Sequence, residues 1–189
     1  MTAEYRIQQD PVTLDNADEK VKPLLQDAKD TLGFVPSMYA HMAKAPGVLS
    51  SYLHGYEYFR ELSGFEPAEQ EVILLTISRA NGCAYCMSAH SMIAEQVSQV
   101  PADTLAALRN DEAIPDPKLA ALSRFTRVMF DSRGRPDPKS VEAFLNAGYQ
   151  ESHIMQIVLA LAVKTLSNYA NHLNHPELDQ AFAGHKWEG

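Results

Sequence analysis

The chain has 189 residues, of which 46% are hydrophobic and 21% are charged, an ordinary balance for a globular protein. Its 16 basic and 24 acidic residues give a formal net charge of −8. This charge argues against nucleic acid as a general partner, because phosphate binding requires clustered lysine and arginine. The length fits one domain over residues 1–189, and a chain of this size buries enough surface to fold without a disulfide.

No segment of the sequence has the pattern of a signal peptide or a membrane span. The N-terminal stretch MTAEYRIQQDPVTLDNADEK has no apolar core, and the longest apolar stretch, from Ile154 to Val163, is interrupted by Gln156. Two cysteines do not make a secreted disulfide framework. We therefore expect a soluble, cytoplasmic protein without a membrane partner, in which a close cysteine pair indicates redox or metal chemistry.

The expected elements are helices, and prolines mark most of their starts. Residues 1–15 show no period and predict an extended arm. Residues 17–32 predict a first helix that stops at Gly33, with Pro23 either a kink or the true start of the helix. Proline is favoured in the first helical turn, because the N–H that it lacks would have no partner there. Prolines open the further helices that we expect from about residues 36, 46, 67, 101, 117, 138 and 176.

Two of these prolines follow an aspartate, Asp116 or Asp137, that is typical of a helix N-cap. A last long helix is expected over about residues 151–173. It is apolar nearly all round from Ile154 to Leu166, which is typical of a central helix or a subunit interface. No stretch shows a convincing strand pattern, so the sequence predicts an all-α fold.

The only two cysteines lie at the predicted start of a helix. Asn81-Gly82 closes the helix that carries Glu71, and the next helix begins at or near Cys83. Cys83, Cys86 and His90 are three and four residues apart, which places them on one helical face with Cβ atoms roughly 5–6 Å apart. A helix N-terminus and a Cys-x-x-Cys motif both lower the pKa of a thiol.

This arrangement predicts a reactive thiol pair with a base beside it. His90 can take the proton of Cys86 directly or through a water, and Glu71 can hold the His90 tautomer or act as the ultimate base. Peroxide would oxidise one thiolate to a sulfenic acid, and the second cysteine would condense with it to a disulfide. An external dithiol would then reset the pair.

Three other interpretations fit the same residues. The two cysteines and His90 could be three zinc ligands, with Glu71 or water as the fourth. The cysteines could instead be an inert buried pair, with His90 a satisfied histidine. Glu71, judged by its spacing alone, could be a solvated glutamate favoured by the helix dipole.

The sequence resembles a known family at this motif. A glutamate twelve residues before C-x-x-C-x-x-x-H is similar to the core motif of the AhpD-like alkylhydroperoxidases, within the carboxymuconolactone decarboxylase superfamily. LGFVPSMYAHMAKAP at 32–46 resembles the lead-in helices of the longer peroxidase-related members, and SRANGCAYCMSAHS at 78–91 resembles their signature. The resemblance spans roughly residues 20–180 of the chain.

The resemblance implies an AhpD-like helical fold, a homo-oligomer (dimer, trimer or hexamer) and peroxide reduction through the cysteine pair. Cys86 would be the peroxidatic cysteine and Cys83 the resolving one, with His90 and Glu71 as the proton relay. The reductant would be a dithiol of the thioredoxin or lipoyl type, or a small thiol. We expect no cofactor and no bound metal.

One position departs from the founding alkylhydroperoxidases, which carry a second histidine where this chain has Tyr85. Tyr85 either donates a hydrogen bond to peroxide or packs. The leading hypothesis is a thiol-dependent peroxidase acting on hydrogen peroxide or organic hydroperoxides. The alternatives are a thiol–disulfide oxidoreductase or redox sensor, and a non-catalytic scaffold. Apolar residues near the motif could line an alkyl pocket or form plain core: Met87, Met92, Tyr52 and Phe59.

Overall fold

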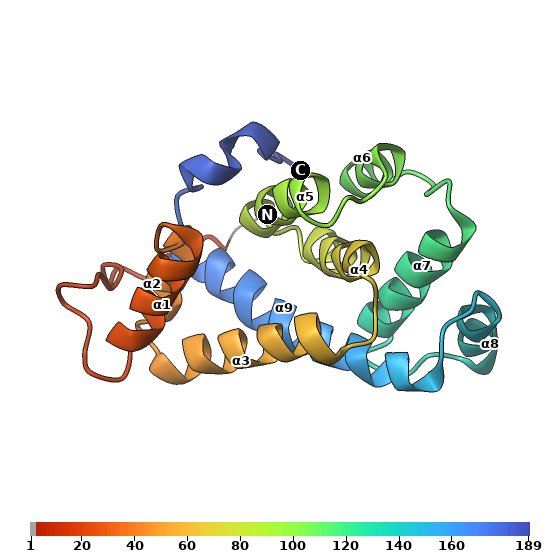
Figure 1. Ribbon diagram of the computed structural model, residues 1–189, viewed down its shortest axis with the longest axis horizontal. Coiled ribbons are helices and arrows are strands. Elements are labelled where there is room, and N and C mark those ends of the chain that lie inside the picture. The colour runs from red at the N-terminus through yellow and green to blue at the C-terminus, as the bar shows by residue number, and fades with distance from the viewer. Residues whose placement is uncertain (1–2) are drawn as a thin grey trace.

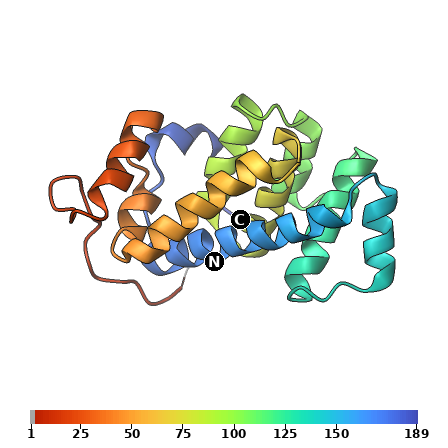
Figure 2. The same ribbon diagram turned by 60° about the horizontal axis from the view of Figure 1, so that its bottom comes forward.

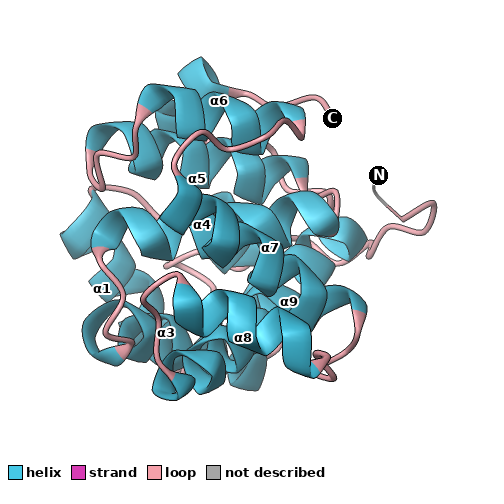
Figure 3. Ribbon diagram, turned by 90° about the vertical axis from the view of Figure 1, so that its right-hand side faces the viewer, coloured by secondary structure: helices cyan, strands magenta, loops and turns pink. Residues whose placement is uncertain are grey.

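The computed structural model describes residues 3–189, and within this range it contains nine α-helices and one 3₁₀-helix (Figure 1). No residue in the range forms a strand, as Figure 3 shows, so the predicted all-α fold is confirmed. The helices are α1 (Lys22–Leu32), α2 (Ser37–Met42), α3 (Pro46–Leu62), α4 (Pro67–Ala80), α5 (Ala84–Gln96), α6 (Ala102–Asn110), α7 (Pro117–Asp131), α8 (Pro138–Asn146), α9 (Glu151–Asn174) and η1 (Gln180–His185).

Proline and aspartate start helices where the sequence predicts it. Helices α3, α4, α7 and α8 each begin at the expected proline. The carboxylate of Asp116 accepts a hydrogen bond from the Leu119 amide at 2.8 Å, and that of Asp137 accepts one from the Ser140 amide at 3.0 Å. Both aspartates therefore act as N-caps, which satisfy amides that have no partner inside the helix.

The first helix has the later of the two starts that the sequence left open. The helical pattern begins at residue 17, but α1 begins at Lys22, and Pro23 lies in its first turn rather than at a kink. The Asp18 carboxylate accepts hydrogen bonds from the amides of Lys20 and Val21, at 2.9 and 3.0 Å. This local turn competes with the helix, as short polar side chains often do.

The last helix also begins later than predicted. We expected it at Pro176, but the chain turns helical only at Gln180, as the 3₁₀-helix η1. The preceding Asp179 accepts a hydrogen bond from the Ser37 amide at 3.1 Å. This contact ties the C-terminal segment to the start of α2, and a regular helix from Pro176 does not form.

The predicted N-terminal arm lies along other elements. Residues 1 and 2 of this arm are outside the described residues. Further on, the amides of Ala3 and Ile7 donate to carbonyls at the end of α9, at 3.2 and 2.9 Å. The Val12 amide donates to Ala40 of α2 at 2.9 Å. The arm is non-helical from residue 3 to residue 21, and these hydrogen bonds hold it to the helices.

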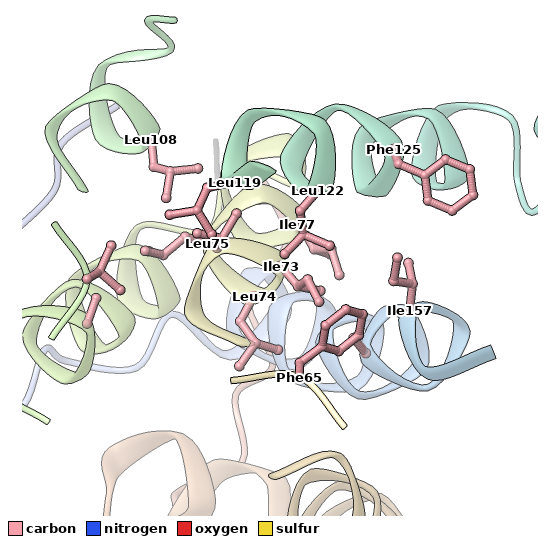
Figure 4. Packing of buried hydrophobic residues seen from close by; sticks show 14 of the residues in the cluster. Phe65, Ile73, Leu74, Leu75, Ile77, Leu108, Leu119, Leu122, Phe125 and Ile157 are labelled. Carbon is pink, nitrogen blue, oxygen red and sulfur yellow. The ribbon is translucent and has the colours of Figure 1, made fainter. Parts of the chain in front are cut away.

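Helix α4 is the centre of the larger hydrophobic core. Its residues 72–75 and Ile77 are completely buried, so α4 has apolar neighbours on several sides. It packs against α5, α7 and α9, and Figure 4 shows Ile77 close to Leu122 of α7, and Ile157 on the neighbouring α9. A helix enclosed in this way is a rigid support for any side chain that it carries, Glu71 included.

A second core lies between α2, α3, α5 and α9, and it contains both cysteines. Its fully or nearly fully buried members include Leu49, Cys83, Cys86 and Val163. Helix α9 contributes to both cores, as expected for the apolar last helix, while its opposite side exposes apolar residues such as Met155. Within residues 3–189 no helix has both the length and the hydrophobicity that crossing a membrane requires.

Helices α3 and α9 lie side by side, as Figures 1 and 2 both show, and a glycine permits this approach. A Cβ atom on Gly55 of α3 would lie 2.9 Å from Cγ2 of Val163 and 3.6 Å from Cδ1 of Leu159. A carbon–carbon separation of 2.9 Å is well inside van der Waals contact, and Val163 is buried. The close packing of α3 on α9 therefore depends on this missing side chain.

We predict that Gly55→Ala lowers the free energy of unfolding by about 1–3 kcal/mol, although alanine is the better helix former. Gly47→Ala is the matched control on the same helix, because a Cβ there meets no atom within 4 Å. The control should leave the stability unchanged or raise it by up to about 1 kcal/mol. Urea denaturation of both variants measures this, and equal stabilities would contradict the packing of α3 on α9.

Candidate active site

The turn between α4 and α5 places the cysteines. Asn81 ends α4, and Gly82 adopts a φ of 66°, in the left-handed region that glycine enters without strain. The Cys83 amide then donates to the Ser78 carbonyl at 3.0 Å, and Cys83 becomes the N-cap of α5. The structure thus places the cysteine pair at a helix N-terminus, as predicted.

The two sulfur atoms lie together against α9. Cys83 and Cys86 are free thiols with exposed fractions of only 1% and 2%. The side-chain amide nitrogen of Asn171 on α9 lies 3.6 Å from the Cys83 sulfur and 3.3 Å from the Cys86 sulfur. It also lies 3.3 Å from the sulfur of Met38 on α2. One amide group of α9 therefore contacts both sulfurs.

The surroundings of the two thiols push their pKa values apart. Burial opposes the Cys86 thiolate, but a hydrogen bond from Cys83, the charge of Lys164 and a hydrogen bond from Ser167 hold the pKa of Cys86 well below its usual value. The same hydrogen bond to Cys86, together with burial, raises the pKa of Cys83. Of the two thiols, Cys86 is therefore the one that loses its proton more readily, and Cys83 the one that retains it.

Glu71 lies completely buried beneath His90. Its Oε2 atom is 2.9 Å from Nδ1 of His90, and its Oε1 atom pairs with the guanidinium of Arg60 on α3. Burial disfavours the carboxylate, but His90 and Arg60 outweigh it and hold the pKa of Glu71 below its usual value. The alternative of a solvated glutamate is wrong, because no part of Glu71 reaches solvent.

His90 is held in one tautomer by this contact. A carboxylate can only accept, so the Nδ1–H of His90 donates to Glu71, and Nε2 is the nitrogen that can take up a proton. Burial is the main cause that lowers the pKa of His90, and the charge of Lys164 adds to it. His90 is therefore neutral at physiological pH and can act as a base one helical turn after Cys86.

Arg60 is fixed from several directions. Its guanidinium donates to the Tyr56 hydroxyl at 2.6 Å and to the Gln70 side-chain oxygen at 3.0 Å, in addition to Glu71. These contacts link α3 to α4 at the level of Glu71. Together with His90, Arg60 keeps a buried carboxylate ionised here. Arg60 was not among the predicted site residues, because its pairing with Glu71 joins separate helices.

Tyr85 faces the C-terminal segment. Its hydroxyl donates to the carboxylate of Asp179 and accepts from the Met38 amide at 3.4 Å, and its ring packs edge-on against Phe182 at 5.9 Å. Burial, reinforced by Asp179, raises the pKa of Tyr85. These contacts favour the packing interpretation of Tyr85 over a hydrogen bond to peroxide.

A buried polar stripe on α9 lies beside the cysteines, and its residues were not among the predicted site residues. Lys164, Ser167 and Asn171 are three and four residues apart, Asn168 adjoins Ser167, and all four are 0–4% exposed. The signal was present as polar residues at helical spacing within and just after the apolar stretch of the last helix. The stripe faces the cysteines, since Asn171 contacts both sulfurs and Ser167, one turn earlier, contributes to the lowered pKa of Cys86.

A row of tyrosines connects His90 with a surface cavity. Tyr39, Tyr52 and Tyr56 contact one another with ring centroids 5.8 and 5.7 Å apart, and Tyr56 lies 6.3 Å from His90. Tyr39 and Tyr56 also line a cavity of about 460 Å³ between α1 and α3, whose other walls include Leu24, Ala28 and Leu53. By contrast, Met87 and Phe59, two of the residues considered for an alkyl pocket, are fully buried core.

The described residues do not add support for the zinc alternative. Among residues 3–189, no three histidine, cysteine, aspartate or glutamate side chains converge as ligands of a metal ion. Glu71 already uses both oxygens for Arg60 and His90. The Glu71 carboxylate, considered as a fourth zinc ligand, is thus already hydrogen-bonded within the protein.

Comparisons with known proteins agree with this description. Residues 47–127 match the model of the carboxymuconolactone decarboxylase family. A peroxidase-related protein from Ralstonia eutropha JMP134, described as an alkylhydroperoxidase AhpD core, superposes with a TM-score of 0.82 at 19% identity, over 95% of this chain and 96% of that one. A peroxidase-related protein from Silicibacter sp. TM1040 gives a TM-score of 0.74 at 19% identity, over 95% and 96%.

A third structure of the same fold carries a different activity in its name. The debrominase Bmp8, solved as a cysteine-to-alanine variant with 2,3,4-tribromopyrrole, superposes with a TM-score of 0.73 at 18% identity, over 95% of both chains. No curated protein sequence matches this chain. At these identities the solved structures show a shared fold, and the reaction has to be argued from the site.

The geometry around Glu71 predicts a large stability effect. Glu71→Gln should lower the free energy of unfolding by about 3–5 kcal/mol, because it leaves the Arg60 guanidinium without its counter-charge in the interior. Because the folded pKa of Glu71 is depressed, the carboxylate stabilises the fold above about pH 4.5, and this contribution is lost as the pH falls through the folded pKa.

The control for this variant is Asp131→Asn, which removes an exposed carboxylate from its pair with Arg127. Both partners of that pair are about half exposed, so the change should cost less than about 1 kcal/mol. Denaturant unfolding at pH 7 compares the two variants. A Glu71→Gln protein as stable as Asp131→Asn would contradict the buried ion pair.

Proposed function

We propose that the chain is a thiol-dependent peroxidase of the carboxymuconolactone decarboxylase superfamily, whose family model matches residues 47–127, and that its AhpD-like fold serves this reaction. Its substrate would be hydrogen peroxide or an organic hydroperoxide, reduced through a dithiol–disulfide cycle of Cys83 and Cys86. The observation that carries the proposal is the pair of adjacent sulfurs, of which Cys86 has the lowered pKa and His90 lies one turn away.

The first half-reaction oxidises Cys86. Cys86 is a thiolate at neutral pH, its proton having passed to solvent by way of Nε2 of His90, and this thiolate attacks one oxygen of the hydroperoxide. The sulfur–oxygen bond forms as the oxygen–oxygen bond breaks, and the leaving alkoxide takes a proton from water, relayed by Nε2 of His90, to become an alcohol. Glu71 keeps the imidazole in the tautomer that this transfer needs.

The second half-reaction closes the disulfide. The Cys83 sulfur attacks the sulfur of the Cys86 sulfenic acid, the hydroxyl leaves as water with the Cys83 proton, and the two sulfurs are joined. An external dithiol then reduces the disulfide by thiol–disulfide exchange. Because both sulfurs are nearly inaccessible, a small thiol or a dithiol on a slender arm, such as a lipoyl group, fits this step better than a broad protein surface.

The cavity beside the tyrosine row supports an organic hydroperoxide as substrate. Its walls are largely apolar and include Leu24 and Leu53, and Tyr56 on its lining contacts His90. A space of about 460 Å³ falls within the range of small-molecule sites. An apolar substrate body would occupy this cavity. Neither Cys86 nor His90 lines it, so the peroxide group would have to pass the tyrosine row to reach them.

A thiol–disulfide oxidoreductase or redox sensor is the alternative function of the same site. It would require a disulfide substrate to reach Cys86, and the 2% exposure of this residue disfavours a protein disulfide. Fast disulfide exchange combined with slow reaction with peroxide would identify that alternative. Reductive dehalogenation, the activity in the name of one structural neighbour, would instead show as halide release from a bromopyrrole.

We also propose that the protein is a homo-oligomer, as its family resemblance implies, and that it is cytoplasmic, as expected from its sequence. The side of α9 that faces away from the core exposes Met155 to 67% and Tyr169 to 54%. Exposed apolar side chains on one helix face support a contact with another copy of the chain.

The cysteine roles can be tested by stopped-flow oxidation with cumene hydroperoxide. Cys86→Ser should abolish turnover, because it removes the nucleophile. Cys83→Ser should still react once and leave a sulfenic acid on Cys86 that dimedone traps, since the resolving thiol is missing. Turnover at the wild-type rate in both variants would refute the proposal, and a trapped sulfenic acid on Cys83 of Cys86→Ser would reverse the roles.

The pH dependence of the oxidation step tests the thiolate and the base together. In the Cys83→Ser protein, the rate with cumene hydroperoxide should stay level from about pH 8 down to about pH 6.5, because the pKa values of Cys86 and His90 both lie below their usual values. It should fall only at lower pH, as His90 becomes protonated and Cys86 a thiol. A rate that halves near pH 8.5, where an ordinary thiol titrates, would contradict this account.

A further inference from the structure

Lys164 is a fully buried cation without a hydrogen-bond partner. Its side chain lies on the inner face of α9 with an exposed fraction of 0%, and its Nζ atom has no partner among residues 3–189. Removing an ammonium group from water costs several kcal/mol unless an opposite charge compensates it. A lysine in this position therefore requires an anion nearby.

The register of α9 against α5 shows where this ammonium lies. Asn171 contacts the sulfurs of Cys83 and Cys86, and Ser167, one turn earlier on the same face of α9, contributes to the lowered pKa of Cys86. Lys164 precedes Ser167 by three residues on the same face of α9, and its charge acts on Cys83, Cys86 and His90 of α5. Helices α5 and α9 are in contact with each other.

Among the charged groups near Lys164, one is available as its counter-ion. Glu71 of α4 is already neutralised by Arg60 of α3 and hydrogen-bonded to His90. The groups of α5 that interact electrostatically with Lys164 are Cys83, Cys86 and His90, of which only Cys86 is suited to be an anion. The phenols of Tyr39, Tyr52 and Tyr56 on α2 and α3 are buried and remain neutral.

We propose that Lys164 is the counter-charge of the Cys86 thiolate and that it favours the reduced form of the cysteine pair. In the reduced protein, the Arg60–Glu71 and Lys164–Cys86 charges both cancel, and the buried site is neutral. In the disulfide form, the thiolate is gone and Lys164 has no anion. Oxidation therefore removes a stabilising interaction, which makes the disulfide easier to reduce.

This role rests on the proposed peroxidase function, because it adds one residue to the same catalytic cycle. A peroxidase must attack with a thiolate and must then release its disulfide to a reductant. The same ammonium would serve both needs, because it stabilises the attacking form and destabilises the oxidised one relative to it. Lys164 is thus a positioning residue that acts through Cys86.

The experiment measures Cys86 directly and needs no peroxide. In the Cys83→Ser background, the rate of alkylation by iodoacetamide as a function of pH reports the titration of Cys86. Lys164→Met should raise the midpoint by at least one pH unit, a tenfold loss of thiolate at a fixed pH below it, whereas Lys164→Arg should retain most of the effect. Lys118→Met, which removes a half-exposed lysine paired with Glu69, is the control and should leave the midpoint unchanged.

The redox equilibrium gives a second readout in the protein with both cysteines. Glutathione reduces the disulfide by forming one oxidised glutathione per cysteine pair, and Lys164→Met should lower that equilibrium constant at least tenfold at pH 7, about 30 mV. An apolar residue in place of a buried charge is usually tolerated, and Lys164→Gln serves if the methionine variant does not fold.

The results separate this proposal from the peroxidase proposal. A folded Lys164→Met or Lys164→Gln protein with the wild-type midpoint and the wild-type equilibrium constant would overturn the role of Lys164, even if the wild type reduces peroxide. A shifted midpoint and constant would support it, even if the wild type failed to reduce any peroxide tested.

Discussion

The carboxylate of Glu71 joins three helices at one point, and the rest of the site depends on it. It accepts from Arg60 on α3 with one oxygen and from His90 on α5 with the other, while α4 holds it in the centre of the core. A buried carboxylate is tolerable only because both contacts are charge-assisted or hydrogen-bonded. The contact with His90 also fixes the imidazole tautomer in which Nε2 can accept a proton. The same carboxylate therefore stabilises the fold and prepares the base.

A second set of contacts to the cysteines comes from α9. The polar stripe of α9 provides the amide of Asn171, the hydroxyl of Ser167 and the charge of Lys164. Each of these groups favours a negative charge on Cys86, against the burial that disfavours it. Ionisation of Cys86 is therefore expected to depend on contacts between α4 and α5 and between α5 and α9, and not on the Cys-x-x-Cys spacing alone.

The sequence was sufficient for most of the fold because local chemistry decides it. Prolines and aspartates mark helix starts through effects within one turn, and α3, α4, α7 and α8 begin where these residues predict. Predictions failed where a side chain made a competing contact, as Asp18 does in its own turn before α1 and Asp179 does across the chain with Ser37. The positions of Cys83, Cys86 and His90 on one helix followed from spacing.

The remaining parts of the site depend on contacts that spacing does not encode. The pairing of Arg60 with Glu71 joins different helices, and the contacts of Asn171 with the cysteines span 85 and 88 residues. For Glu71, the spacing favoured a solvated side chain, and only the family resemblance indicated a place beside His90. Lys164 lies within an apolar helix, and the sequence does not show which residues a single polar side chain there contacts.

In the proposed cycle, the reduction of one hydroperoxide consumes both thiols of the cysteine pair. The most direct measurement titrates the reduced protein with cumene hydroperoxide under anaerobic conditions and counts the remaining thiols with a chromogenic disulfide. The account predicts that one equivalent of hydroperoxide removes both thiols and joins Cys83 to Cys86. Two free thiols that persist in the presence of excess hydroperoxide would contradict it.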